Sequence, residues 1–201
     1  VKIKLDGTDL PSPAIVSVNV HNEAGRIPFA VVVFIDGNPA EKTFDFSSGA
    51  STAPGKTISI SMGFDLNPPE IFSGIIIKHA LKVRGGSSVV ILECRHTAIK
   101  MTLGRKTKVT EETASAVKED TILKALFSTY GVAVETSGTF IEHKGFMQYN
   151  ISDWDLMMTR AEVNGKIVYY SSKKSKFMVT DPPATAPSGA VTIAYGKDIE
   201  Q

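Results

Sequence analysis

The sequence has little of what covalent cross-links and metal sites require. A single cysteine, Cys94, occurs in 201 residues, which excludes an internal disulfide framework and fits synthesis in a reducing compartment. The histidines show no metal-ligand spacing such as H-E-x-x-H, and one cysteine cannot build a zinc knuckle. We therefore expect no metal site and no cofactor. The four histidines are His21, His79, His96 and His143.

Charge of one sign and long apolar runs are scarce as well. The 22 basic and 21 acidic residues leave a net charge of +1, which gives no reason to expect a nucleic-acid partner. Apolar runs such as Ala30–Ile35 are the length of a strand, far short of the ~20 residues that span a bilayer, so we expect no membrane-spanning segment. With 42% hydrophobic residues, the chain has enough apolar surface to bury a real core.

Catalytic motifs are missing or incomplete. No G-x-G-x-x-G or Walker A loop occurs. Ser115–Lys118 matches the S-x-x-K pattern of penicillin-binding enzymes, but the companion motifs are absent and the pattern recurs at Ser171–Lys174, where we expect a hairpin turn. Arg105–Lys108 carries charge suited to phosphate, but Glu111 and Glu112 offset it, so we expect a solvated loop. The sequence offers no catalytic constellation, and we expect that the chain is not an enzyme.

Strand patterning dominates residues 1 to about 105. Val16, Val18 and Val20 alternate with polar residues and predict one buried face, and Gly74 is a candidate β-bulge within a long strand. Six or more strands with polar turns at short spacing favour a barrel or sandwich. The expected strands, after a strand-like run at residues 1–5, are residues 16–20, 29–35, 43–46, 58–62, 71–83 and 89–95.

The pattern changes after Lys100 to mixed helix and strand. Glu119–Tyr130 predicts a helix with Ile122, Leu123, Leu126 and Phe127 on one face, ended by a glycine. Short extended segments are expected at residues 132–135 and 140–149, a hairpin at 167–170 and 177–179, and a proline-containing linker from Asp181. A new strand is expected from Val191. The predicted fold is therefore mainly β with an α+β insert.

The clearest local signal is a capped helix that begins after Ser152. Ser152 is the expected N-cap, and Asp153 and Asp155 place negative charge in the first turn, where the helix dipole favours it. Two residues apart on a helix, these aspartates point to different sides, so they do not form an acid/base pair. Trp154 starts the apolar face and is expected to be a core anchor, and Asn164-Gly165 predicts the C-cap.

Several segments match a known family in consistent order along the chain. They include the sequences IPFA at 27–30, PG at 54–55, IFSGII at 71–76 and ECR at 93–95, with YGKD at 195–198. The most specific block has an aspartate-tryptophan-aspartate helix start, an arginine-alanine-glutamate middle and an asparagine-glycine end. Together these segments resemble the N-terminal hub region of VgrG spike proteins of type VI secretion systems, related to phage late-control protein D and to contractile tail hubs. The signature residues of the block are Asp153, Trp154, Asp155, Arg160, Glu162 and Gly165.

The resemblance implies a hub β-barrel at 1–105, a small α/β insert at 106–187 and the start of a second β-barrel at 188–201. It also implies a homotrimer that adapts a hexameric inner tube to a spike, with tube protein and spike or effector domains as partners. Such a protein is assembled in the cytoplasm and then exported or injected with the apparatus. The chain starts at Val1 within a strand-like run and stops at Gln201, so we expect a piece of a longer protein.

Two other interpretations stay open. One is a β-barrel binding module of a surface or adhesion protein, which the strand-rich composition also fits. The other is a hydrolase fragment, because some relatives carry lysozyme or toxin domains, although these lie outside the region that resembles this chain.

Overall fold

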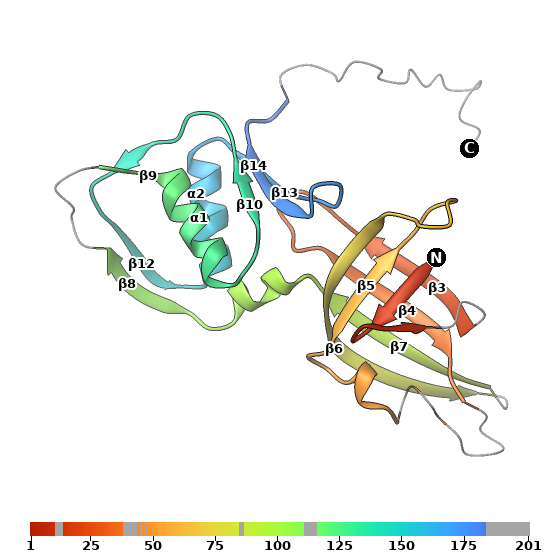
Figure 1. Ribbon diagram of the computed structural model, residues 1–201. Helices are drawn as coiled ribbons and strands as arrows, with labels where there is room; N and C mark the ends of the chain where they lie inside the picture. Colours follow the sequence, from red (N-terminus) through yellow and green to blue (C-terminus); the bar gives the residue numbers. More distant parts are fainter. Residues whose placement is uncertain are drawn as a thin grey trace, which may run out of the picture.

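The described residues form a curled antiparallel sheet and a smaller α/β part (Figure 1). The structure is a computed structural model, and it describes residues 1–10, 14–37, 44, 46, 48–84, 87–110 and 116–183. The fold is mainly β, with a curled half-barrel followed by a small insert that carries both long helices. The expected fold class is thus confirmed over these residues.

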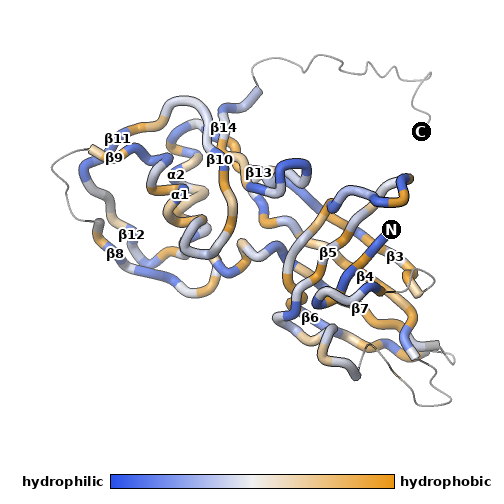
Figure 2. Tube along the Cα trace, viewed as in Figure 1, coloured by the Kyte–Doolittle hydropathy of each residue, from blue (hydrophilic) through white to orange (hydrophobic). Residues whose placement is uncertain are grey.

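Seven strands form the larger sheet in the order β2-β1-β5-β6-β7-β4-β3, and every neighbouring pair is antiparallel. Alternate residues of β4 and β5 are buried, which gives the sheet one face for its core. Hydrophobic stretches run along the central strands in Figure 2. The strands are β1 (Lys2–Leu5), β2 (Thr8–Leu10), β3 (Ile15–His21), β4 (Phe29–Ile35), β5 (Thr57–Ser61), β6 (Glu70–Arg84) and β7 (Ser87–Arg95).

Two details of this sheet differ from the sequence-based predictions. The pairing of β3 with β4 is irregular between Ile15 and Ser17, and Val16 is 56% exposed rather than buried. A bulge places one extra residue in the strand, which turns the alternation over and explains the exposure. Gly74 is not a bulge, because it pairs in register with Ile58. A Cβ at Gly74 would lie 2.2 Å from the carbonyl oxygen of Arg95, so this glycine allows close backbone approach.

The α/β part follows a 3-10 helix, η3 (Thr97–Thr102). Its helices α1 (Glu119–Thr129) and α2 (Asp153–Val163) confirm the two predicted helices. A three-stranded sheet has the order β10-β14-β13, in which β10 runs parallel to β14, and two short ribbons pair β8 with β12 and β9 with β11. The strands are β8 (Lys106–Thr110), β9 (Val117–Lys118), β10 (Val134–Thr136), β11 (Glu142–His143), β12 (Phe146–Ile151), β13 (Ile167–Ser171) and β14 (Lys176–Thr180).

The prediction of a loop at Arg105–Lys108 was wrong, although these residues are exposed to solvent as expected. Lys106 begins β8, which pairs with β12. A strand rich in lysine has weak local strand propensity, so only its pairing with a partner about 40 residues away in the sequence makes it a strand. The predicted hairpin at 167–179 is confirmed by β13 and β14, which pair from Ile167 to Ser171.

The α/β part has its own apolar core, which also takes in residues from before the insert. Phe177 lies at its centre and is fully buried, with its ring 5.3 Å from the rings of Phe127 and Tyr170. Residues of the sheet side that join this core are Ile27, Ala98 and Met101. The larger sheet encloses a separate core that includes Phe34, Phe72 and Leu92.

The loop between β3 and β4 connects the two parts by hydrogen bonds to the backbone of β13 (Ile167–Ser171). Gly25 N–H donates to the carbonyl oxygen of Val168 at 2.6 Å, and the Asn22 side-chain amide donates to the carbonyl oxygen of Tyr170 at 2.8 Å. Both acceptors lie on β13, on the edge that β14 leaves unpaired. This loop therefore attaches the larger sheet to the edge of the smaller one.

Some expectations fall on residues outside the described ranges. These are Thr43 and Asp45 of the strand expected at 43–46, Ser115 of the S-x-x-K match, and the second barrel expected from 188. Phe44 and Phe46 are described and lie outside any strand, so the strand expected there is not confirmed. Within the described ranges, no helix is both long and apolar enough to cross a membrane.

Candidate functional site

The signature block begins with a capped helix, as the sequence predicts. Ser152 Oγ accepts a hydrogen bond from Asp155 N–H at 3.1 Å and donates to the Asp155 carboxylate at 2.7 Å. Gly165 has φ +65 and follows the C-cap residue Asn164, which is the left-handed conformation expected of a glycine stop. Glu162 lies on the exposed side of the helix, and its carbonyl oxygen accepts from Gly165 N–H at 2.8 Å.

The two aspartates have different surroundings, which confirms that they do not face one another. Asp155 is exposed, whereas Asp153 is buried. Asp153 Oδ2 accepts from Lys106 Nζ at 2.6 Å and from the Tyr130 hydroxyl at 2.5 Å, and Asp153 Oδ1 accepts from Gln148 Nε2 at 2.9 Å. One carboxylate thus joins β8, the end of α1, β12 and the start of α2.

These contacts determine the charge of Asp153. Burial alone would raise the pKa of its carboxyl, but the hydrogen bonds from Lys106, Tyr130 and Gln148 outweigh burial and hold the pKa below its ordinary value of 3.8. The same hydrogen bond to Asp153 raises the pKa of Lys106. The pair is therefore ionised at neutral pH and acts as a clamp between elements.

Asp153→Asn is expected to lower the free energy of unfolding by about 1–3 kcal/mol at neutral pH, because it removes charge-assisted hydrogen bonds at a buried position. A carboxyl whose pKa is lower in the folded state stabilises the fold above its unfolded pKa, and that contribution is lost as the pH falls through the folded pKa. The difference between wild type and variant should accordingly shrink below about pH 4. Urea unfolding followed by circular dichroism at several pH values measures it.

Asp155→Asn is the matched control, since Asp155 lies two residues away on the exposed side. It should cost only the ~0.3–1 kcal/mol that a charge contributes at a helix N-terminus. An Asp153→Asn loss no larger than that of the control at pH 7, or a loss that grows on acidification, would contradict the clamp.

A second buried charge cluster surrounds Glu119, the first residue of α1. The Glu119 carboxylate forms an ion pair with Arg160 of α2 and contacts His143 Nε2 at 2.6 Å, and it accepts a hydrogen bond from the Asn164 side chain. Arg160 also lies 2.8 Å from His143 Nε2. Burial lowers the pKa of Arg160, and the adjacent carboxylate supplies its counter-charge. The signature arginine thus ties the end of α2 to the start of α1.

Trp154 is buried, with 8% of its surface exposed, as the core interpretation expects. Its ring meets that of Phe177 edge-on at a centroid distance of 5.8 Å. Met157 and Ala161 of the same helix face are fully buried beside it in the same core. The packing role of Trp154 is clear from these contacts, while the signature role of the six residues stays a prediction.

Cys94 and His96, which carry nucleophilic and acid/base groups, are both buried. Burial raises the pKa of the Cys94 thiol to about 12 and lowers the pKa of His96 to about 4. His96 Nδ1 accepts from Ala98 N–H at 3.1 Å and so caps η3, and its ring packs on Tyr170 and Phe177. Across the described ranges, no group of three or more metal-ligating side chains converges.

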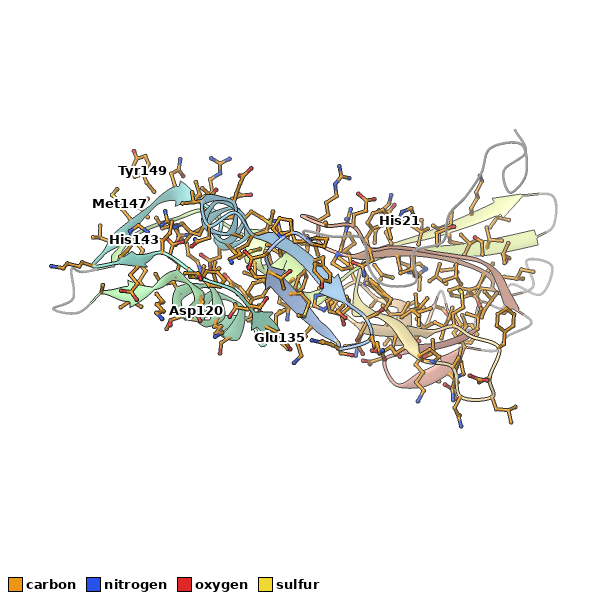
Figure 3. All side chains as sticks on the ribbon, turned by 90° about the horizontal axis from the view of Figure 1, so that it is seen from above. His21, Asp120, Glu135, His143, Met147 and Tyr149 are labelled. Atoms are coloured by element: carbon orange, nitrogen blue, oxygen red, sulfur yellow. The ribbon has the colours of Figure 1, made fainter. Side chains whose placement is uncertain are left out.

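Exposed apolar side chains are instead prominent at two places. The loop between β5 and β6 presents Phe64 and Leu66, which are 111% and 99% exposed. Figure 3 shows Met147 and Tyr149 pointing outward from β12, and Val109 of β8 pairs opposite Met147. Large apolar groups held in water at such positions are typical of surfaces that contact another protein.

Sequence reasoning missed most partners in the two charge clusters. Glu119 looked like an ordinary helix-start acid, and Lys106, Tyr130, Gln148 and His143 carried no motif. Their partners lie 5 to 47 residues away in the sequence. The sequence contained one partial signal for these clusters. The signature residues Asp153 and Arg160 lie in the same helix, and each would need an opposite charge nearby if it were buried.

Comparisons with known proteins identify the same fold in tail and secretion proteins. A 43 kDa tail protein from the Shewanella oneidensis prophage MuSo2 superposes with a TM-score of 0.69 at 8% identity, over 89% of this chain and 52% of that one. An E. coli component of the type VI secretion system, described as structurally similar to the bacteriophage T4 tail proteins gp27 and gp5, gives 0.64 at 11% identity, over 90% and 48%. The Francisella PdpA–VgrG complex in its lidded form gives 0.58 at 13% identity, over 94% and 30%.

These likenesses show a shared fold, and the chain spans about half or less of the length of the structures it matches. No curated protein sequence matches the chain. Residues 1–201 match the profile of a family described as the Alg8 N-terminal domain.

Proposed function

The chain belongs to the Alg8 N-terminal domain family, and we propose that it is a structural hub subunit of a contractile injection apparatus of the phage-tail or type VI secretion kind. The observation that carries the proposal is the fold: tail proteins and a VgrG complex share it over about nine-tenths of this chain. The matched proteins are described as tail and secretion-system components, which supports a structural role rather than an enzymatic one.

In this proposal the half-barrel and the α/β insert form one third of a trimeric ring. The ring connects a hexameric inner tube to a spike, and the apparatus is assembled in the cytoplasm before export. The proposed limits are 1–105 for the first barrel, 106–187 for the insert and 188–201 for the start of a second barrel. The six signature residues of α2 and its C-cap serve to hold the insert in shape, as the contacts of Asp153, Trp154 and Arg160 support.

The exposed loop between β5 and β6 supports an assembly role. Met62 N–H donates to the carbonyl oxygen of Pro69 at 3.2 Å, which closes the base of the loop. A Cβ at Gly63 would lie 3.1 Å from Pro68, so the prolines pack tightly against the glycine. Phe64 and Leu66 are therefore displayed on a braced loop, which lowers the entropy lost when a partner binds.

The full-length protein is expected to be a trimer by size-exclusion chromatography with light scattering, and to co-pellet with polymerised inner-tube protein. Replacing both Phe64 and Leu66 by serine should reduce the co-pelleted amount roughly tenfold or more, because buried apolar anchors carry most binding energy at an interface. Stability should be unchanged, since both side chains are fully exposed in the chain alone.

Leu103→Ser is the control, because Leu103 is also exposed but lies outside this loop. It should leave co-pelleting unchanged. A stable monomer that ignores tube protein would contradict the hub and favour a binding module, and turnover of peptidoglycan by this chain would favour a hydrolase fragment.

A further inference from the structure

A row of four side chains crosses the outer face of the larger sheet near the α/β part. The pairing register places His21 opposite Phe29, Phe29 opposite Arg95, and Arg95 opposite Ile75. The His21 and Phe29 rings stack at a centroid distance of 4.3 Å with 7° between their planes, and Arg95 Cζ lies 4.6 Å from the Phe29 centroid. His21 is labelled on β3 in Figure 3.

The Arg95 guanidinium contacts Phe29 but keeps N–H groups that can bind a further partner. The group lies over the Phe29 ring, and its N–H donors stay available for a bidentate partner, since no hydrogen bond from them is found within the described ranges. Within the described ranges, Arg95 forms no ion pair. Glu93 shares its side of β7 but is held by Lys78 at 2.6 Å, so it does not serve as the counter-charge.

A cavity of about 540 Å³ opens beside this guanidinium, between the sheet and α2. Its walls combine apolar and aromatic side chains with two guanidinium groups. The second guanidinium, that of Arg26, forms one ion pair within the described ranges, with the exposed Glu23 at 3.3 Å. The lining residues are Gly25, Arg26, Ile27, Phe29, Arg95, Ile99 and Trp154.

We propose that this cavity is a binding site for a carboxylate on a partner protein, namely an acidic side chain next to an apolar one. Arg95 receives the carboxylate through its free N–H edge, Arg26 adds positive charge at the rim, and Ile27, Ile99 and Trp154 receive the apolar neighbour. A carboxylate carries the single negative charge that balances Arg95, since the other guanidinium of the cavity, that of Arg26, already has Glu23 as its counter-charge.

The cavity contains its own reporter, because Trp154 is the only tryptophan of the chain and lines it. The probes are two blocked dipeptides that differ in one group, N-acetyl-Phe-Asp-amide and N-acetyl-Phe-Asn-amide. Titrating the aspartate probe should change Trp154 emission in a saturable way. The asparagine probe and the Arg95→Gln variant should each bind roughly tenfold more weakly or worse, because a charge-assisted pair is lost.

Three arms complete the design. Arg105→Gln removes an exposed arginine away from the cavity and should leave binding unchanged. Arg95→Lys keeps the charge but loses the planar guanidinium, so it should bind the aspartate probe more weakly than wild type does. If Arg95→Gln does not fold, this variant shows whether Arg95 binds the carboxylate. 3-Phenylpropionate, a free acid without a peptide, should bind more weakly than the aspartate probe if the natural source is a protein.

Equal binding of the two dipeptides, unchanged binding in both Arg95 variants, no saturable emission change, or tighter binding of the free acid would each overturn the proposal. The emission titration needs no other subunit. A failed trimer test would therefore not contradict the carboxylate site, and a failed titration would not contradict the hub function.

Discussion

Trp154→Ala is expected to lower the free energy of unfolding by about 3–5 kcal/mol. The indole is almost fully buried at the start of α2 and packs edge-on against Phe177, which itself contacts Phe127 and Tyr170. Truncation would remove one wall of this aromatic cluster and leave a void that a helix fixed at both ends by caps cannot close. Urea unfolding followed by far-UV circular dichroism measures the loss without relying on tryptophan emission.

Trp154→Phe is the graded comparison, since it keeps an aromatic ring in the cluster and should cost less than the alanine variant. Val163→Ala is the control on the same helix, because Val163 is exposed and a surface change there should stay within about 0.5 kcal/mol. If Trp154→Ala were as mild as Val163→Ala, the indole would not be a core anchor, and its place would be at an interface.

Glu119→Ala is expected to cost about 3–5 kcal/mol, because breaking a buried ion pair leaves the other charge uncompensated. The Glu119 carboxylate is almost completely buried and is the counter-charge that the structure provides for Arg160. The substitution also removes the acceptor for Asn164 and the contact with His143, so the start of α1, the end of α2 and β11 lose their common partner. Thermal and urea unfolding give the size of the effect.

Glu142→Ala is the matched control for this cluster. Glu142 faces Lys118 at 4.0 Å with both side chains more than half exposed, and such surface pairs contribute about 0–1 kcal/mol. The double variant Glu119→Ala with Arg160→Met should recover part of the loss, because no unpaired charge remains. An unrecovered double variant would mean that the cost comes from lost packing and not from the buried charge.

The sequence predicted those parts of the fold that local signals determine. The caps of α2, the helix at α1 and the hairpin of β13 and β14 each depend on residues within a few positions of one another, and the structure confirms them. Local signals failed where a distant strand decides the outcome. Val16 is exposed because of the irregular pairing of β3 with β4. Position 74 requires a glycine because the backbone of β7 lies too close for a side chain.

For the candidate site, the sequence predicted only the capped helix and its signature residues. The resemblance named Asp153 and Arg160 as signature residues, but nothing in the sequence indicated that Lys106 and Glu119 form ion pairs with them. Ion pairs between residues about 40 positions apart leave no periodic pattern, because one charged residue among many looks like a solvated one. The exposure of Phe64 and Leu66 could not be predicted either, since two apolar residues in a turn show no helix or strand periodicity.

The attachment of the β3–β4 loop to β13 has a mechanical consequence. Along the part of the chain that the structure describes, the larger sheet is connected covalently to the α/β part through η3, and a single connection would allow rotation about it. The hydrogen bonds from Asn22 and Gly25 to β13 add a second connection, formed by the β3–β4 loop, and a second connection resists rotation about the first. We therefore expect a force that acts on one part to reach the other through the backbone of β13 as well as through η3.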